Sequence, residues 1–173
     1  MVDGRLLRRM SAIPTVKWRG KELRISVELV PEPMHYINLR SALPEHWDEI
    51  RKTVYRRAGY RCEICGGKGD KHPVEAHELW DYDDKRHVMS LKRCLALCPT
   101  CHLCHHLGYA NVSGQTEKAE TQLQRINGFS DDELRDYVEY VFNVYKRRSR
   151  YEWMLDIERV RRYFAERENW RYT

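Results

Sequence analysis

Long apolar runs are missing from this chain of 173 residues, and so is low-complexity sequence. No stretch approaches the roughly 18 consecutive apolar residues of a membrane-spanning helix, and no charged segment followed by an apolar one opens the chain as a secretory signal would. We therefore expect a cytoplasmic protein, of a bacterial cell or a phage-infected host, that has no membrane contact. A hydrophobic fraction of 42% excludes a disordered chain and suffices for a folded core.

Cysteine is absent outside residues 62–104, where all six cysteines lie, and six of the eight histidines fall within residues 62–106. A secreted disulfide scaffold would spread its cysteines along the chain. Cysteine clustered with histidine in a chain without a leader indicates metal binding instead.

The net charge of +5 is small but unevenly distributed. Residues 1–21 hold six Lys and Arg against one Asp, which leaves 25 charges of each sign in the rest of the chain. Such basic segments suit contacts with a nucleic-acid backbone, although they are equally typical of a solvated tail and helix face. The residues that we expect to contact phosphates are Arg5, Arg8, Arg9, Arg61, Lys92, Arg93, Lys146, Arg147 and Arg148.

Hydrophobic periodicity predicts an α+β fold, with a strand-bearing metal core and helices before and after it. Alternation of apolar and polar residues over 22–30 predicts a half-buried strand. Apolar residues at helical spacing, with proline or a capping box at several starts, predict the helices. These helices cover residues 44–58, 99–107, 116–126 and 156–167, and a further one begins after Ser130.

The predicted organisation follows from these elements. It consists of a basic arm (1–21), a strand-helix lead-in packed on the core (22–59), the metal core (60–110) and a C-terminal helical extension (111–173).

Two C-x-x-C pairs predict a structural zinc site. Cys62 and Cys65 form the first pair, and Cys98 and Cys101 form the second. Two intervening residues let both sulfurs of a pair reach one tetrahedral ion from a tight turn, so two such turns complete a closed four-sulfur shell. Because Cys104 follows Cys101 at the same spacing, a C-x-x-C-x-x-C arrangement is the alternative. In the preferred assignment Cys94 and Cys104 are small buried residues.

Histidines beside the second pair predict another metal site. His102 and His106 are four residues apart and lie on one face of the predicted short helix. If the extended stretch that contains His77 packs beside this helix, a third imidazole joins them and leaves coordination positions open, as a catalytic ion requires. The alternative for the pair is two surface histidines. We expect His105 to face solvent or a phosphate.

Residues 62–108 resemble the HNH endonuclease family, which are ββα-metal nucleases supported by a four-Cys zinc, and in particular uncharacterised bacterial and phage members. The resemblance is carried by the sequences CEICGG from Cys62, VEAHE from Val74 and LALCPTCH from Leu95, with His106 following. A weaker likeness extends over most of the chain. The resemblance to this family implies a zinc-supported ββα core with a structural Zn. It also implies a second divalent ion (Mg, Mn or Zn) on His77, His102 and His106, and hydrolysis of DNA.

The chain departs from the family pattern at the general base. The family ends its first strand in Asp-His or His-His, where the first residue binds the metal and the second is the base. His77 matches the first position, but Glu78 stands at the second, and no Asn occurs near Lys92 where the family has one. Glu78 is therefore either a weak base or a partner that holds a histidine ring.

The sequence thus favours a metal-dependent DNA endonuclease or nickase, with His77 and Glu78 as its catalytic residues. The altered base position keeps a second hypothesis open, namely a nucleic-acid-binding protein without catalysis on the same scaffold. A protein-interaction module is a third, which the many Trp and Tyr residues permit. Oligomeric state has no sequence signal.

Overall fold

The computed structural model describes residues 16–158 and 160–162. Three of the predicted phosphate contacts, Arg5, Arg8 and Arg9, lie outside these residues, as does part of the helix predicted over 156–167. At the predicted start of this last helix the structure has a strand instead, because Met154–Asp156 forms β5.

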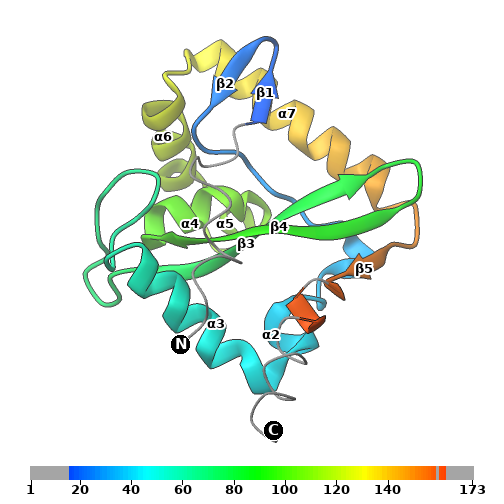
Figure 1. Ribbon diagram of the computed structural model, residues 1–173. Coiled ribbons are helices and arrows are strands. Elements are labelled where there is room, and N and C mark those ends of the chain that lie inside the picture. The colour runs from blue at the N-terminus through cyan, green and yellow to red at the C-terminus, as the bar shows by residue number, and fades with distance from the viewer. Residues whose placement is uncertain (1–15, 159, 163–173) are drawn as a thin grey trace, which may run out of the picture.

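A long antiparallel hairpin runs through the centre of the molecule (Figure 1). It consists of β3 (Glu75–Asp83) and β4 (Val88–Leu97), and His77 of β3 lies opposite Leu95 of β4. Strand β5 adds to the far side of β4 in parallel, so β3 stays at the edge of this sheet.

The two faces of the hairpin pack into different hydrophobic cores, because successive strand residues point to opposite sides. Leu95 and Leu97 belong to the core shared with the helices that follow the hairpin. Cys94 and Ala96 belong to the core shared with the helices that precede it. The hairpin is therefore covered by helices on both faces, as Figure 1 shows.

In the described part of the chain, the helices before the hairpin are the 3-10 helix η1 and the α-helices α2 and α3. The structure gives their bounds as Glu32–Met34, Leu39–Ala42 and Pro44–Arg57. Between the hairpin and β5 lie α4 (Pro99–His105), α5 (Leu107–Val112), α6 (Thr116–Asn127) and α7 (Asp131–Arg148).

The helix predictions over 44–58 and 116–126, and the one after Ser130, are confirmed to within a residue or two. Ser130 forms the predicted capping box with Glu133, and Gly128 ends α6 in the left-handed conformation. The predicted helix over 99–107 is shorter, because the backbone of His106 leaves the helical region and a new helix, α5, runs through Gly108.

The strand predicted over 22–30 is largely wrong. Only Lys21–Leu23 is a strand, β2, and it pairs with β1 (Val16–Trp18) through a two-residue turn. Ile25 and Val27 are still buried, but their backbone groups bond to side chains. Asn127 accepts from the Ile25 N–H at 3.2 Å and donates to its carbonyl at 2.9 Å, and the Tyr137 hydroxyl accepts from the Val27 N–H at 3.0 Å.

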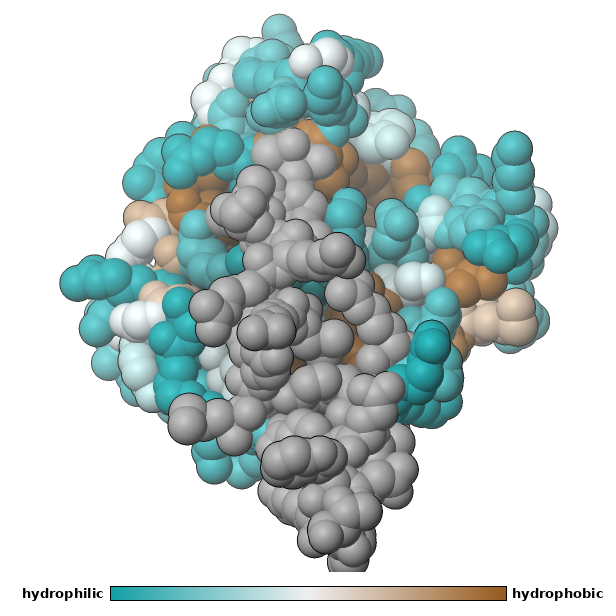
Figure 2. All heavy atoms as spheres, in the orientation of Figure 1, coloured by the Kyte–Doolittle hydropathy of each residue, from teal (hydrophilic) through white to brown (hydrophobic). Residues whose placement is uncertain are grey.

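The face shown in Figure 2 is mostly hydrophilic over the described residues, with apolar side chains in recesses between the elements. Within residues 16–158 and 160–162, no helix combines the length and the apolar character needed to cross a membrane.

Candidate metal centres

The four cysteines of the two predicted pairs come together at one point. Cys62 and Cys65 lie in the turn after α3, Cys98 caps the start of α4 and Cys101 lies in its first turns. Their sulfur atoms all lie within 4.8 Å of one another. The structure therefore contains a four-Cys cluster, made of the residues that the spacing predicted.

The geometry of this cluster suits zinc. A tetrahedral ion with Zn–S bonds of about 2.3 Å holds its sulfurs about 3.8 Å apart, and the Cys65 and Cys98 sulfurs are 3.6 Å apart. The contact between Cys62 and Cys101 lowers the pKa of the Cys62 thiol and raises that of Cys101, as two sulfurs that share a hydrogen bond do. Gln122 donates to the Cys101 sulfur at 3.1 Å, as a polar group around a zinc thiolate does.

Local backbone geometry explains how the first pair forms. Gly66 adopts a φ of +74°, a value that side chains disfavour, and its N–H donates to the Cys62 carbonyl at 2.9 Å. Gly69 lies so close to Pro99 that an added Cβ would overlap the proline ring at 2.5 Å. The loop after the first pair is thereby packed against the start of α4.

Glu63, between the two cysteines of the first pair, ties the turn to the hairpin. Its carboxylate accepts from the Ala96 N–H at 2.7 Å and pairs with Arg57 and Arg93 at 2.9 and 2.5 Å. The Glu63 N–H also donates to the Ala96 carbonyl at 2.9 Å, so backbone and side-chain bonds together hold the turn against β4.

Cys94 and Cys104 are buried outside the cluster, as predicted. Burial raises the pKa of both thiols, which keeps them protonated and chemically inert.

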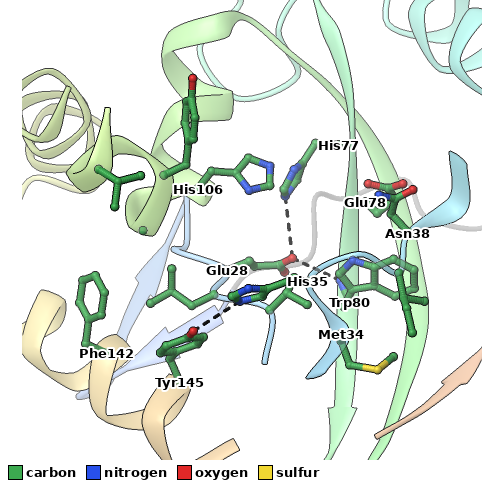
Figure 3. Close-up of a pocket in the computed structure, with 16 residues that line it drawn as sticks. Glu28, Met34, His35, Asn38, His77, Glu78, Trp80, His106, Phe142 and Tyr145 are labelled. Atoms are coloured by element: carbon green, nitrogen blue, oxygen red, sulfur yellow. Dashed lines mark hydrogen bonds and ion pairs between the residues drawn. The ribbon is translucent and has the colours of Figure 1, made fainter. Parts of the chain in front are cut away.

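Three histidines form the second cluster. His77 comes from β3, His102 from α4, and His106 from the junction of α4 and α5. One ring nitrogen of each lies within 4.8 Å of the others, and the Nε2 atoms of His102 and His106 are 3.0 Å apart. Figure 3 shows the rings of His77 and His106 turned toward each other.

The ring nitrogens of this cluster are better placed to coordinate a metal ion than to hydrogen-bond with one another. Both ring nitrogens of His77 are buried without a hydrogen-bond partner in the described structure, which is costly unless a ligand satisfies them. Two nitrogens 3.0 Å apart both reach an ion about 2.1 Å from each. A carboxylate oxygen of Glu75 contacts His102 Nδ1, which leaves Nε2 for the ion, as in the carboxylate–histidine pairs of metal sites.

The electrostatics keep the imidazoles of His77 and His106 neutral, which is the form that binds a metal. Burial, and then the neighbouring His105, hold the pKa of His77 well below its usual range. Burial and His102 lower the pKa of His106 to about 4. The hydrogen bond with His102 lowers the pKa of Glu75, so its carboxylate stays charged.

The prediction that His105 faces solvent or phosphate is wrong. It is 2% exposed, and its ring lies on that of His77 with 4.3 Å between centroids. Burial lowers its pKa to about 3. His105 lies within α4, four residues after the buried Cys101, so the two side chains share a buried face of the helix.

Glu78, the predicted base, lies on the other face of β3 from His77. It is opposite Cys94 in the hairpin, and its carboxylate accepts from the Leu39 N–H at 3.1 Å, at the start of α2. Burial raises its pKa. Figure 3 shows Glu78 beside Asn38 and apart from the His77 ring.

Glu28 is the acidic residue closest to the His77 ring, and sequence reasoning missed it. Its Oε2 lies 3.8 Å from His77 Nε2 and accepts from the Trp80 N–H, at the open edge of β3, at 3.4 Å (Figure 3). Burial raises the pKa of Glu28 to about 8. Glu28 occupies a polar position of the alternation over residues 22–30, so nothing in the sequence distinguishes it.

The basic residues predicted to contact nucleic acid lie in different environments. Lys92 is exposed. It lies in a β-bulge of β4, because Arg93 pairs with Leu79 and Leu91 pairs with Trp80, which leaves Lys92 without a partner residue on β3. Arg61, Lys146 and Arg147 are also exposed.

Arg93 and Arg148, two of the predicted phosphate contacts, are already engaged in contacts within the protein. The Arg93 side chain is only 9% exposed and pairs with Glu63, so it does not lie on the surface. Arg148 makes two hydrogen bonds to Asp84, both 2.8 Å, and lies over the Tyr82 ring. Both guanidinium groups serve the fold.

Comparison of the chain with protein-family models, with curated proteins and with solved structures finds no match. The site is therefore interpreted from its own geometry and from the sequence motifs.

Proposed function

We propose that this protein is a metal-dependent nuclease of the HNH type, which hydrolyses phosphodiester bonds in DNA. The observation that carries the proposal is the convergence of His77, His102 and His106 next to a four-Cys cluster, with both buried ring nitrogens of His77 lacking a hydrogen-bond partner among the described residues. One cluster suits a closed structural zinc and the other suits an ion with open positions.

The order of the elements supports this proposal. An antiparallel hairpin, β3 and β4, leads directly into helix α4. His77 lies in the first strand and His102 in the helix, which is the placement that a ββα-metal site requires. Because Cys98 and Cys101 stand immediately before His102, the sulfur site holds the helix that carries the histidines.

A divalent cation on the three imidazoles would stabilise the negative charge that develops on a phosphate under attack by water. The chain's own groups position that cation: Glu75 orients His102, and burial keeps water away from His77. In the reaction, the attacking water loses a proton as its oxygen bonds to phosphorus, and the leaving oxygen gains one. Glu78 stays the predicted base, and Glu28 is a second carboxylate at the site.

Plasmid nicking with magnesium or manganese tests the proposal. His77→Ala should lower the nicking rate at least a hundredfold while the zinc content stays at one ion. His87→Asn is the matched control, because His87 lies in the hairpin turn away from the cluster, in a left-handed conformation that asparagine tolerates. Equal rates for His77→Ala and the wild type would exclude this site from catalysis.

A nucleic-acid-binding protein without catalysis is a second candidate. The placement of Glu78 favours it, because a carboxylate bonded to the Leu39 N–H is already occupied in the fold. This candidate predicts salt-sensitive binding and no cleavage with any cation, so the nicking assay separates the two. Comparison of Glu78→Gln with Glu28→Gln then shows which carboxylate, if either, accepts the proton.

A further inference from the structure

A cavity of about 660 Å³ opens directly beside the histidine cluster. His77 and His106 form one end of it, and it extends between η1, α5 and α7. Figure 3 shows the side chains of Phe142 and Tyr145 approaching it from α7 and Trp80 from β3. The site of the proposed chemistry and the cavity are thus one continuous space.

The cavity has aromatic and aliphatic walls. His35 and Tyr145 stack with their ring planes 7° apart and are joined by a 3.4 Å hydrogen bond. Tyr109 and Val112, three residues apart on α5, line the cavity although 61% and 84% of their surfaces are exposed. Apolar side chains left exposed beside a cavity are typical of a ligand site.

The size of the cavity limits the ligand. Pockets of about 300–1,000 Å³ enclose small molecules, so this one admits a single nucleoside but no base-paired duplex. The flat aromatic walls suit a heterocyclic base, since stacking on aromatic side chains is tolerant of sequence.

Charge decides which part of a nucleotide enters. The carboxyl groups of Glu28 and Glu78 lie in the cavity wall, and no Lys or Arg is among its described lining residues to pair with a phosphate there. The carboxyl oxygens can accept hydrogen bonds from the amino and imino N–H groups at the edge of a base. The phosphate is favoured at the other end, where the three imidazoles would hold a cation.

We propose that this cavity binds an unpaired nucleobase, and that the preferred substrate is therefore single-stranded or locally unpaired nucleic acid. The position of the phosphate rests on the proposed function, whereas the base site depends on the cavity alone. Tyr109, which lines the cavity and is largely exposed, offers a ring on which the base would stack.

Binding without cleavage tests this proposal. Fluorescence anisotropy would compare a labelled 12-nucleotide single strand, the matching duplex and a duplex with one unpaired base, using protein with zinc on its cysteines and no second cation. We expect the single strand and the bulged duplex to bind at least tenfold more tightly than the plain duplex.

A pair of tyrosine variants locates the effect. Tyr109→Ala should weaken single-strand binding at least fivefold, as the loss of one stacked base does, and leave duplex binding unchanged. Tyr140→Ala is the control, since Tyr140 is 50% exposed on α7 and does not line the cavity. Because Tyr109 is itself exposed, its replacement leaves both cores intact, which thermal melting checks.

Equal affinity for single strand and duplex would overturn the proposal, and so would equal effects of Tyr109→Ala and Tyr140→Ala. Failure of the nuclease proposal would look different. In that case no substrate is nicked with any cation, while the preference for unpaired bases and its loss in Tyr109→Ala persist.

Discussion

The contact between Glu75 and His102 makes a quantitative prediction about the histidine site. The Glu75 carboxylate contacts His102 Nδ1, and this fixes Nε2 toward His106 Nε2, 3.0 Å away. Loss of such a partner costs about 10- to 100-fold in metal affinity. Since 38% of the Glu75 side chain is exposed, solvent screens the interaction. We therefore expect Glu75→Gln to weaken binding about tenfold, or about 1.4 kcal/mol.

Titration with Co²⁺ of protein that already holds zinc on its cysteines measures this affinity, because the visible absorption of cobalt reports the histidine site. Glu139→Gln, on the exposed face of α7, is the control and should bind like the wild type. An affinity for Glu75→Gln within twofold of the wild type would refute the orienting role. A loss beyond a thousandfold would refute it too, because Glu75 would then be a direct ligand.

Two further predictions concern the whole molecule. Removal of zinc by a chelator should abolish the near-UV circular dichroism of the tryptophans, and zinc should restore it. The reason is that zinc binding at a four-sulfur site contributes about 10–16 kcal/mol, whereas the usual free energy of unfolding is about 5–15 kcal/mol. An unchanged spectrum would contradict this. Glu28→Gln should change the pH dependence of stability. Burial raises the folded-state pKa of Glu28 to about 8 from 4.5, so its favourable contribution is complete below pH 4.5 and is lost as the pH rises through 8. In urea titrations without a second cation, the variant should gain stability over the wild type between pH 5 and 8.5, and a constant difference would count against the burial of Glu28.

Local signals in the sequence were sufficient for α3, α6 and α7 and for the four-Cys cluster. A capping box at Ser130 or a glycine at position 128 acts within one turn, so its effect does not depend on the rest of the chain. The C-x-x-C spacing likewise limits how far apart two sulfurs can lie. The meeting of Cys62 with Cys98 across 36 residues followed from the chemistry of one ion, which needs both pairs.

The strand prediction over 22–30 failed because alternation reports burial and not hydrogen bonding. Ile25 and Val27 point inward as predicted. Their backbone groups, however, bond to Asn127 and Tyr137, more than 100 residues further along the chain. Periodicity cannot reveal a side chain that takes the place of a neighbouring strand.

The histidine prediction succeeded for a partly wrong reason. The expected helical face, with residues four apart, does not exist as such, because α4 ends at His105 and His106 has φ −99° and ψ +48°. His102 and His106 still converge, and His105 is buried on the face of α4 that it shares with Cys101. Glu28 was out of reach of sequence reasoning, since only the folded chain brings it to the edge of β3 beside His77.

The two clusters are mechanically coupled, because they share the start of α4. Cys101 and His102 are consecutive, and Cys98 directly follows the last residue of β4, the strand paired with the one that carries His77. An ion on the sulfurs therefore fixes the angle between hairpin and helix, and that angle sets the distance from His77 to His102. A closed four-sulfur site thus supplies rigidity to the histidine site, whose imidazoles are otherwise held by packing and by contacts with Glu75 and Glu28. It follows that a weakened four-Cys cluster should lower cation affinity at the histidines before any histidine is changed.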